Sequence, residues 1–158
     1  MDEKGEGRRM IEFTVLGVPV AQPRARATAR GGYARVYNPR GPIDTYRACV
    51  RLAARAAFAG DLIEGPVVVD MTLVFPRPKN RVWKRKPMPR EWHTGKPDSD
   101  NLVKSICDAV TGVVWRDDAQ VAVLVAHKYV AAGDEQPHTV VKISRLGSVL
   151  ENCSVLEN

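Results

Sequence analysis

The sequence predicts an α+β fold: a single small domain with a mixed β-sheet and two main helices. Short runs rich in β-branched residues are separated by stretches whose apolar residues recur at helical spacing. The chain has 158 residues, which fits one domain, and its hydrophobic fraction of 44% is enough for a buried core. These observations are typical of a soluble globular domain.

The first half of the chain supplies two strands and one helix. Residues 11–15 are β-prone and predict a first strand that ends before Gly17. The alanine-rich stretch 44–58 has apolar residues at helical spacing and predicts the first helix. Residues 67–75 form a continuous β-branched and aromatic run, which is typical of a central strand.

The second half supplies another helix and two more strands. A helix is expected to begin at residues 98–100 and to end before Gly112, because glycine is a natural C-terminal stop. Residues 120–130 and 139–143 each predict a strand. The turn-like residues 133–137 between them indicate that these two strands form a hairpin.

Two basic segments are expected outside the regular elements. Residues 22–35 contain arginines, tyrosines and a Gly-Gly turn, and predict a loop or hairpin suited to phosphate contact and stacking. Residues 76–95 are rich in basic residues and proline and predict a long basic loop. The alternative for each segment is a solvated surface feature without a ligand.

The net charge of +6 indicates a polyanionic partner, with nucleic acid first and an anionic membrane second. A solvated basic surface without a partner is the alternative. No apolar run is long enough to span a bilayer, and residues 1–9 lack the pattern of a secretory signal. We therefore expect a cytoplasmic protein without a membrane partner.

Both ends of the chain are expected to lie outside the folded domain. Residues 1–9 are polar and predict a flexible N-terminus. Residues 148–152 and 154–158 repeat the sequence SVLEN, and residues 147–158 predict a disordered tail without a catalytic role. The folded domain is then expected to span residues 10–146.

The cysteine and histidine residues give no metal-ligand pattern. Cys49, Cys107 and Cys153 are odd in number and far apart, and they lack zinc spacing. The three histidines also lack metal-ligand spacing. A reducing compartment fits best, with Cys49 and Cys107 as small buried residues.

The carboxylates of Asp98, Asp100 and Asp118 are the candidate catalytic groups. Their oxygens are the ligands that a hard divalent cation prefers, and one or two such ions can support phosphodiester hydrolysis. Lys104 follows Asp100 by one helical turn and could stabilise a phosphate transition state. Asp118 joins the pair only if its strand end lies beside the helix N-terminus. The alternatives are helix caps and turns, or another metal enzyme such as a sugar-nucleotide transferase.

A long central motif resembles the RusA family of Holliday-junction resolvases. The motif comprises Lys96–Lys104 (KPDSDNLVK), Asp108–Trp115 (DAVTGVVW) and Asp117–Val121 (DDAQV). Residues 13–19 and 22–26 are similar to that family's N-terminal strand and basic turn, especially in its prophage-type members. The resemblance covers residues 11–145.

The resemblance implies a homodimeric RusA-like fold and a set of site residues. It implies that the essential acids are Asp98, Asp100 and Asp118, which hold Mg²⁺, with Mn²⁺ as a substitute, and that the essential lysine is Lys104. No organic cofactor is expected. Residues expected to bind DNA are Arg24, Arg26, Lys96 and Lys128.

The function implied by the resemblance is a Mg²⁺-dependent endonuclease, bacterial or phage-encoded, that acts in DNA recombination and repair. It would resolve four-way DNA junctions by paired symmetric phosphodiester cleavage. A homodimer also follows from the need for two incisions, since one chain offers one acidic cluster. The alternatives are a non-catalytic module that binds branched DNA and a metal nuclease acting on forks or flaps.

Overall fold

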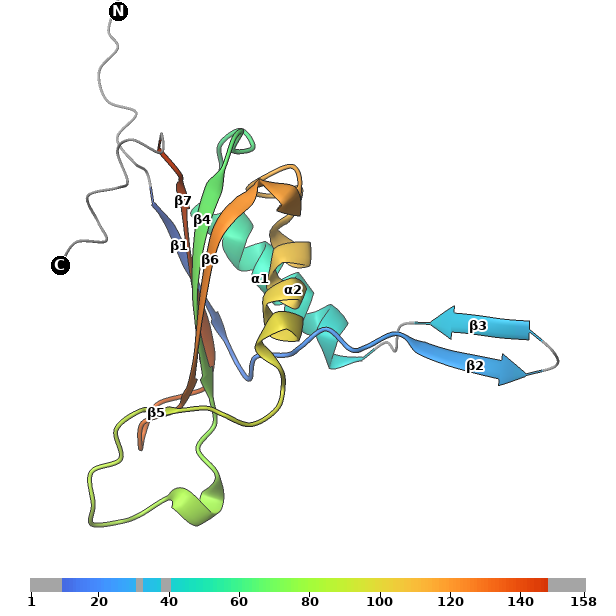
Figure 1. The fold of residues 1–158 in the computed structure, drawn as a ribbon. Coiled ribbons are helices and arrows are strands. Elements are labelled where there is room, and N and C mark those ends of the chain that lie inside the picture. Colours follow the sequence, from blue (N-terminus) through green and yellow to red (C-terminus); the bar gives the residue numbers. More distant parts are fainter. Residues whose placement is uncertain (1–9, 31–32, 38–40, 148–158) are drawn as a thin grey trace, which may run out of the picture.

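The computed structural model describes residues 10–30, 33–37 and 41–147. Its elements follow one another as β1 (Ile11–Leu16), β2 (Arg26–Arg30), β3 (Tyr33–Tyr37), α1 (Pro42–Ala57), β4 (Val67–Phe75), the 3₁₀ turn η1 (Lys79–Arg81), β5 (Glu91–Trp92), α2 (Ser99–Val110), the 3₁₀ turn η2 (Asp118–Gln120), β6 (Val121–Val130) and β7 (His138–Arg145). The five-stranded sheet has the order β1-β7-β4-β6-β5 (Figure 1). The predicted α+β fold with a mixed sheet and two main helices is confirmed.

Strand β4 is the central strand of the sheet, as residues 67–75 predicted. It pairs parallel with β6 and antiparallel with β7. The predicted hairpin between residues 120–130 and 139–143 is therefore wrong, because β4 lies between these two strands. β4 carries buried apolar residues at every second position from Val67 to Phe75, so neighbours on both edges remove more of its surface from water than a β6–β7 hairpin would.

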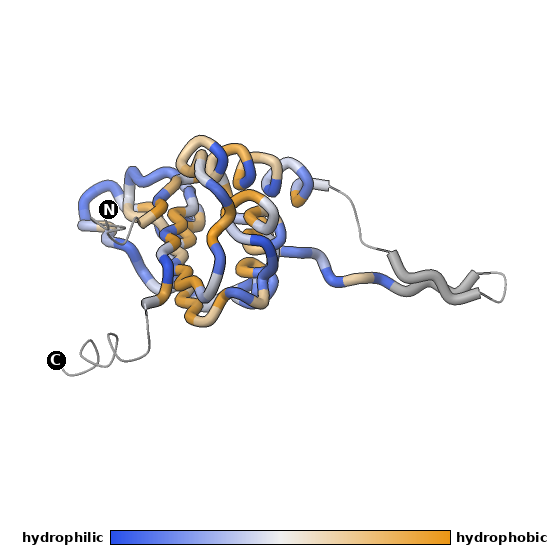
Figure 2. The backbone as a smooth tube through the Cα atoms, turned by 90° about the horizontal axis from the view of Figure 1, so that it is seen from above, coloured by the Kyte–Doolittle hydropathy of each residue, from blue (hydrophilic) through white to orange (hydrophobic). Residues whose placement is uncertain are grey.

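Helices α1 and α2 cover one face of the sheet (Figure 1), and Figure 2 shows the hydrophobic segments gathered in this body. The covered face of β4 and the buried side of α2 form the centre of the core. The fully buried residues there are Val67, Val69, Met71, Leu73, Leu102, Ile106, Ala109 and Val110. Burying one large apolar side chain stabilises the fold by roughly 1.5–3 kcal/mol, so this layer fixes the position of α2.

The two helices are also joined by polar contacts. Arg47 of α1 donates hydrogen bonds to Asp108 of α2 and to Gln22, which precedes β2. Tyr46 bonds Thr139 of β7 at 2.8 Å inside the core. These contacts hold α2 in a fixed orientation relative to α1 and the sheet.

The two described cysteines differ in burial. Cys107 is buried as predicted, and burial, with the nearby carboxylates of Asp118 and Asp108, raises the pKa of its thiol to about 12. Cys49 is exposed, so its predicted burial is wrong. The reason is the helical period: α1 buries the stripe that includes Val50, and Cys49 lies off that stripe. Cys153 lies outside the described residues.

Two segments project from the body of the molecule (Figure 1). Strands β2 and β3 pair as a separate antiparallel hairpin, one of the two forms expected for residues 22–35. The long loop 76–95 contains η1 and the short β5, and it is anchored by the buried side chain of Arg77. Arg77 donates to the carbonyl of Ala131 and to Glu91, both at 2.9 Å. The hydrogen bonds of the buried Arg77 thus hold in place a loop that the sequence predicted only as irregular.

The predicted N-terminal segment and the repeated SVLEN tail lie outside the described residues, apart from Gly147. The boundaries of the folded domain therefore stay a prediction at both ends. None of the described helices is long and apolar enough to cross a membrane.

Candidate nuclease site

The N-terminus of α2 presents two carboxylates. Asp98 is the N-cap residue in an extended conformation, and Asp100 lies in the first turn. The positive end of the helix dipole favours negative charge at both positions. The Asp98 side chain makes no capping hydrogen bond, and Arg24 approaches it at 3.4 Å. Both carboxylates are exposed and accessible from solvent.

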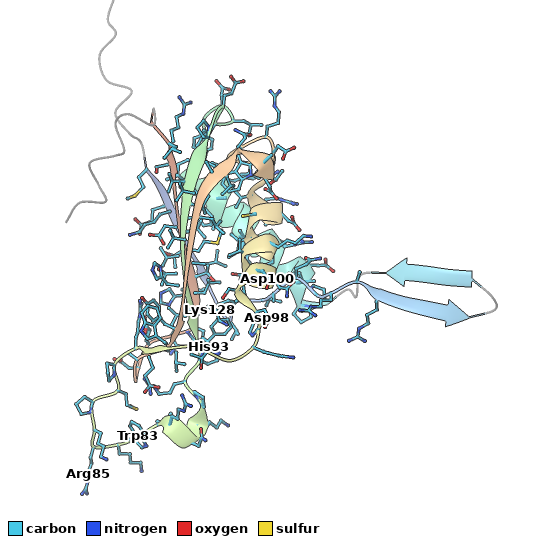
Figure 3. The ribbon with its side chains drawn as sticks, viewed as in Figure 1. Trp83, Arg85, His93, Asp98, Asp100 and Lys128 are labelled. Atoms are coloured by element: carbon cyan, nitrogen blue, oxygen red, sulfur yellow. The ribbon has the colours of Figure 1, made fainter. Side chains whose placement is uncertain are left out.

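Lys128 of β6 holds the turn that precedes Asp98. Its Nζ donates to the carbonyl oxygen of Gly95 at 2.8 Å and to that of Pro97 at 2.6 Å. Figure 3 shows Lys128, Asp98 and Asp100 near one another, close to the N-terminal end of α2. The lysine that the resemblance assigned to DNA contact is thus bonded to the backbone that carries the acidic residues.

His93 lies beside this turn and was missed by the sequence reasoning. Its ring stacks on Phe75 with centroids 4.4 Å apart, and its backbone N–H bonds the Lys128 carbonyl at 3.0 Å. Its buried Nδ1 has no partner among the described residues. Burial and the charge of Lys128 lower the pKa of His93, which favours a neutral ring. Its position shortly before the acidic motif was the only signal in the sequence.

The remaining basic candidates are exposed. Lys104 lies one helical turn after Asp100 on the surface of α2. Arg24 has a side chain 80% exposed and lies on the segment that leads to β2, where Arg26 begins the projecting hairpin. Lys96 is exposed in the turn before Asp98. The structure therefore places Arg24 beside Asp98 and Lys128 on the turn before it, whereas Lys104 follows Asp100 by one turn on the same face of α2.

Asp118 lies at the opposite end of α2. Its Oδ1 accepts hydrogen bonds from the Trp115 indole at 3.0 Å and from the hydroxyl of Thr111, the residue that ends α2. Among the described residues, no three His, Cys, Asp or Glu side chains form a group that could hold a metal ion. The structure of one chain brings Asp98 and Asp100 together but does not bring Asp118 to them.

Hydrogen bonds between side chains and the backbone hold the segment around Asp118 in place. Gln120 Oε1 accepts from the backbone N–H groups of Arg116 and Asp117 at 2.9 and 3.1 Å, and its Nε2 donates to the Ile63 and Gly65 carbonyls. The Asp117 side chain accepts from the Ala119 N–H at 2.8 Å. Asp117 and Gln120 therefore position Asp118. The sequence reasoning missed Thr111 and Trp115, whose only signal was their spacing from Asp118.

The fold and these side chains define a small α+β domain with a carboxylate pair at a helix N-terminus, beside two projecting basic segments. The family model described as endodeoxyribonuclease RusA matches residues 17–144 of this sequence. The chain therefore belongs to the RusA endodeoxyribonuclease family, as its central motif predicted. Its membership of a prophage-type branch stays a prediction.

The sequence is also similar to the uncharacterized protein YqaN of Bacillus subtilis (strain 168). The two chains are 32% identical over 143 residues, which cover 87% of this chain and 98% of YqaN. The similarity thus extends over nearly the whole described domain.

Proposed function

We propose that this protein is a Mg²⁺-dependent endonuclease that resolves Holliday junctions by paired symmetric cleavage during DNA recombination and repair. The observation that carries the proposal is the family match, which spans the whole acidic motif from Lys96 to Val121. The net charge of +6 fits a polyanionic substrate. The proposed location is the cytoplasm of a bacterial cell, with a bacterial or phage-encoded gene.

The proposed metal ligands are Asp98, Asp100 and Asp118. Carboxylate oxygens are suitable donors for Mg²⁺, with Mn²⁺ as a substitute. A bound ion of this kind supplies charge neutralisation and an activated water. One chain alone does not fit a three-carboxylate site, because Asp118 lies at the other end of α2. The pair Asp98 and Asp100 is the part of the site that a single chain presents.

The basic residues have separate proposed roles. Lys104 is a point charge for the phosphate oxygens, held on the helix that carries Asp100. Arg24, Arg26 and Lys96 contact the DNA backbone on the side of the hairpin. Figure 3 places Trp83 and Arg85 at the far part of the long loop, where they can contact a DNA arm beyond the carboxylates. Lys128 contributes by holding the turn at Pro97.

A substrate panel tests the proposal. The purified protein is incubated with a mobile four-way junction, a fork, a flap and a linear duplex, in Mg²⁺ or Mn²⁺. We expect paired symmetric nicks in the junction and little cleavage of the duplex. Preferential cleavage of forks or flaps would favour the alternative nuclease, and binding without cleavage at any metal concentration would favour a non-catalytic binding module.

Substitution of the carboxylates separates catalysis from binding. Asp98→Asn and Asp100→Asn should abolish cleavage and leave junction affinity equal or higher, because they remove negative charge near the phosphates. Glu12→Gln, at an exposed carboxylate of β1 on the opposite edge of the sheet from β6 and β5, is the matched control and should cleave normally. Loss of junction binding in the two site variants would mean that the carboxylates are structural.

A further inference from the structure

Three aromatic side chains gather at one edge of the sheet. Trp92 of β5 lies opposite Tyr129 of β6, and their ring centroids are 4.7 Å apart with the planes inclined by 26°. The ring of His127 is inclined by 10° to that of Tyr129 at 6.2 Å, and its centroid lies 6.3 Å from that of Trp92. Offset rings at such distances attract one another. We call Trp92, Tyr129 and His127 the aromatic stack.

The aromatic stack lies on the face of the sheet that helices α1 and α2 do not cover (Figure 1). Paired residues of neighbouring strands share a face, and Tyr129 pairs with Val74 of β4. The neighbouring Leu73 points to the other face, where it belongs to the core under the helices. Lys128 pairs with Leu73. The aromatic stack and the lysine that holds the turn before Asp98 are therefore on opposite faces of the sheet.

The indole of Trp92 has one covered face and one open face. Tyr129 stacks on one side of it, yet Trp92 is 66% exposed. In the part of the chain that the structure describes, β5 is the edge strand, so no strand lies beyond Trp92. A planar group that extends the aromatic stack at this end would remove the open face of the indole from water.

The segment that leads into Trp92 is strongly basic. Residues 76–95 contain seven lysines and arginines and one acidic residue, Glu91. Two arginines share that carboxylate: Arg77 donates to it at 2.9 Å, and Arg81 approaches it at 3.4 Å. One carboxylate cannot neutralise both guanidinium groups, and the Arg81 side chain is 53% exposed. A positive charge is therefore available to a ligand beside the aromatic stack.

The two ends of the aromatic stack differ in charge. At the His127 end, the carboxylate of Asp70 lies 3.6 Å from the imidazole. Near the middle, Arg90 lies over the Tyr129 ring at 5.5 Å and is bonded to Glu135. The surplus of positive charge is thus at the Trp92 end. An anionic planar ligand would approach the open indole face from that end.

We propose that the aromatic stack is a second nucleic-acid site, at which an unpaired base of single-stranded DNA stacks on the open face of Trp92 and a neighbouring phosphate contacts Arg81. Aromatic rings beside a positive surface are the pattern of single-strand binding sites, and stacking accepts any base. The source is DNA, because the chain belongs to a family of endodeoxyribonucleases. The site uses no carboxylate of the acidic motif, so it does not rest on the proposed function.

Binding of short oligonucleotides without metal tests this site. The protein is titrated in EDTA into fluorescein-labelled oligo(dT), or into an oligomer of equal length in which abasic residues replace every thymidine. Fluorescence anisotropy gives the affinity. We expect oligo(dT) to bind at least about tenfold more tightly, because only this oligomer has bases that can stack. Equal affinity for the two oligomers would overturn the site, since phosphate contacts alone would then explain the binding.

Substitutions of Trp92 separate stacking from apolar contact. Trp92→Ala and Trp92→Leu should lose at least about tenfold in affinity for oligo(dT), whereas Trp92→Phe keeps a ring and should lose less. The affinity for the abasic oligomer should stay the same in all three variants. Leu52→Ala on α1, at a position 71% exposed, is the matched control and should bind as the wild type does.

Circular dichroism checks that each variant is folded. The exposure of Trp92 favours a folded chain after truncation, and Trp92→Leu keeps an apolar side chain against Tyr129. Wild-type affinity for oligo(dT) in either folded variant, Trp92→Ala or Trp92→Leu, would overturn the stacking site.

The phosphate contact is tested by its dependence on salt. Arg81→Gln should lower the slope of log K against log salt for oligo(dT) by about 0.7, the value expected for one phosphate contact on a single strand. Trp92→Ala should leave the slope unchanged, because stacking releases no counterion. An unchanged slope in Arg81→Gln would overturn the contact between Arg81 and the DNA.

Two further results distinguish this site from a protein interface and from the proposed function. A wild type that sediments as a dimer, together with a Trp92→Ala variant that sediments as a monomer, would assign the aromatic stack to contact between copies and overturn the DNA site. Junction cleavage without binding of oligo(dT) would overturn only the second site. Binding of oligo(dT) that depends on Trp92, in a protein that cleaves no DNA, would overturn only the proposed function.

Discussion

The Nζ of Lys128 lies 2.6 Å from the carbonyl oxygen of Pro97, the residue that precedes Asp98. A second bond, 2.8 Å long, joins the same Nζ to the Gly95 carbonyl. Two bonds from a charged donor hold the turn against β6, and the bond to Pro97 is the half-buried one of the two. Lys128 therefore determines where the Asp98 carboxylate is presented.

Lys128→Ala should lower junction cleavage by at least about tenfold while junction affinity changes little. The reason is that the turn loses its donor, whereas few phosphate contacts are lost. The salt dependence of junction binding is the measurement, because a lost phosphate contact lowers the slope of log K against log salt by about one. Lys142→Ala, at an exposed position of β7, is the control. A reduced slope with Lys128→Ala alone would assign Lys128 to direct DNA contact.

Trp115→Phe should weaken the proposed metal site without unfolding the protein. The substitution removes the indole N–H that bonds Asp118 at 3.0 Å, and the smaller ring costs about 1–2 kcal/mol of stability at this fully buried position. Loss of a group that orients a metal ligand typically costs 10–100-fold in affinity. We therefore expect Mn²⁺ affinity to fall by at least about tenfold.

Val114→Ala is the matched control for that substitution. Val114 is fully buried next to Trp115, and its truncation lowers stability without removing a bond to Asp118. The measurements are Mn²⁺ titration and urea unfolding of both variants. An equal loss of Mn²⁺ affinity in the two variants would show that Trp115 acts through stability alone.

Local patterns predicted the fold well where burial and helical spacing determine the structure. The apolar run of β4 predicted a central strand, and Gly112 marked the end of α2 with an accuracy of two residues. The wrong hairpin shows the limit of such patterns. The turn between β6 and β7 is compatible with strands that are adjacent and with strands separated by β4, because both arrangements need a short connection. Which arrangement forms depends on the burial of β4, a long-range property.

For the candidate site too, the sequence predicts the spacing of residues within one helix but not the position of residues that follow it. The helical period alone relates Asp100 to Lys104, so their spacing on α2 could be predicted from the sequence. The position of Asp118 depends on where the chain goes after α2. Because residues 111–118 turn back at the end of the helix, Asp118 stays near Thr111. Its distance from Asp98 therefore follows from the length of α2.

The buried hydrogen bond between Tyr46 and Thr139 should contribute measurably to stability. Burial raises the pKa of Tyr46 to about 12, so its hydroxyl is neutral under ordinary conditions. Tyr46→Phe leaves the Thr139 hydroxyl buried without this partner and should cost about 1–2 kcal/mol. The double variant Tyr46→Phe/Thr139→Val should lose less than the sum of the single variants. Urea unfolding of the four chains gives the coupling energy, and strict additivity would contradict the assignment.

The ring of His93 should make stability depend on pH just below neutrality. Burial and the charge of Lys128 lower the pKa of His93 in the folded chain below its ordinary value of 6.5. Between the two pKa values the unfolded chain binds more protons, so stability rises with pH in that range. The contribution is fully present above pH 6.5 and is lost as the pH falls toward the folded-state pKa.

His93→Phe removes the titrating group and keeps a ring that can stack on Phe75. We expect the free energy of unfolding of this variant to change less than that of the wild type as the pH falls below 6.5. The measurement is urea unfolding of both chains across this range. The other histidines and the carboxylates are common to both proteins, so their effects cancel in the difference. Parallel pH profiles would mean that His93 binds its proton equally well in the folded and unfolded chains.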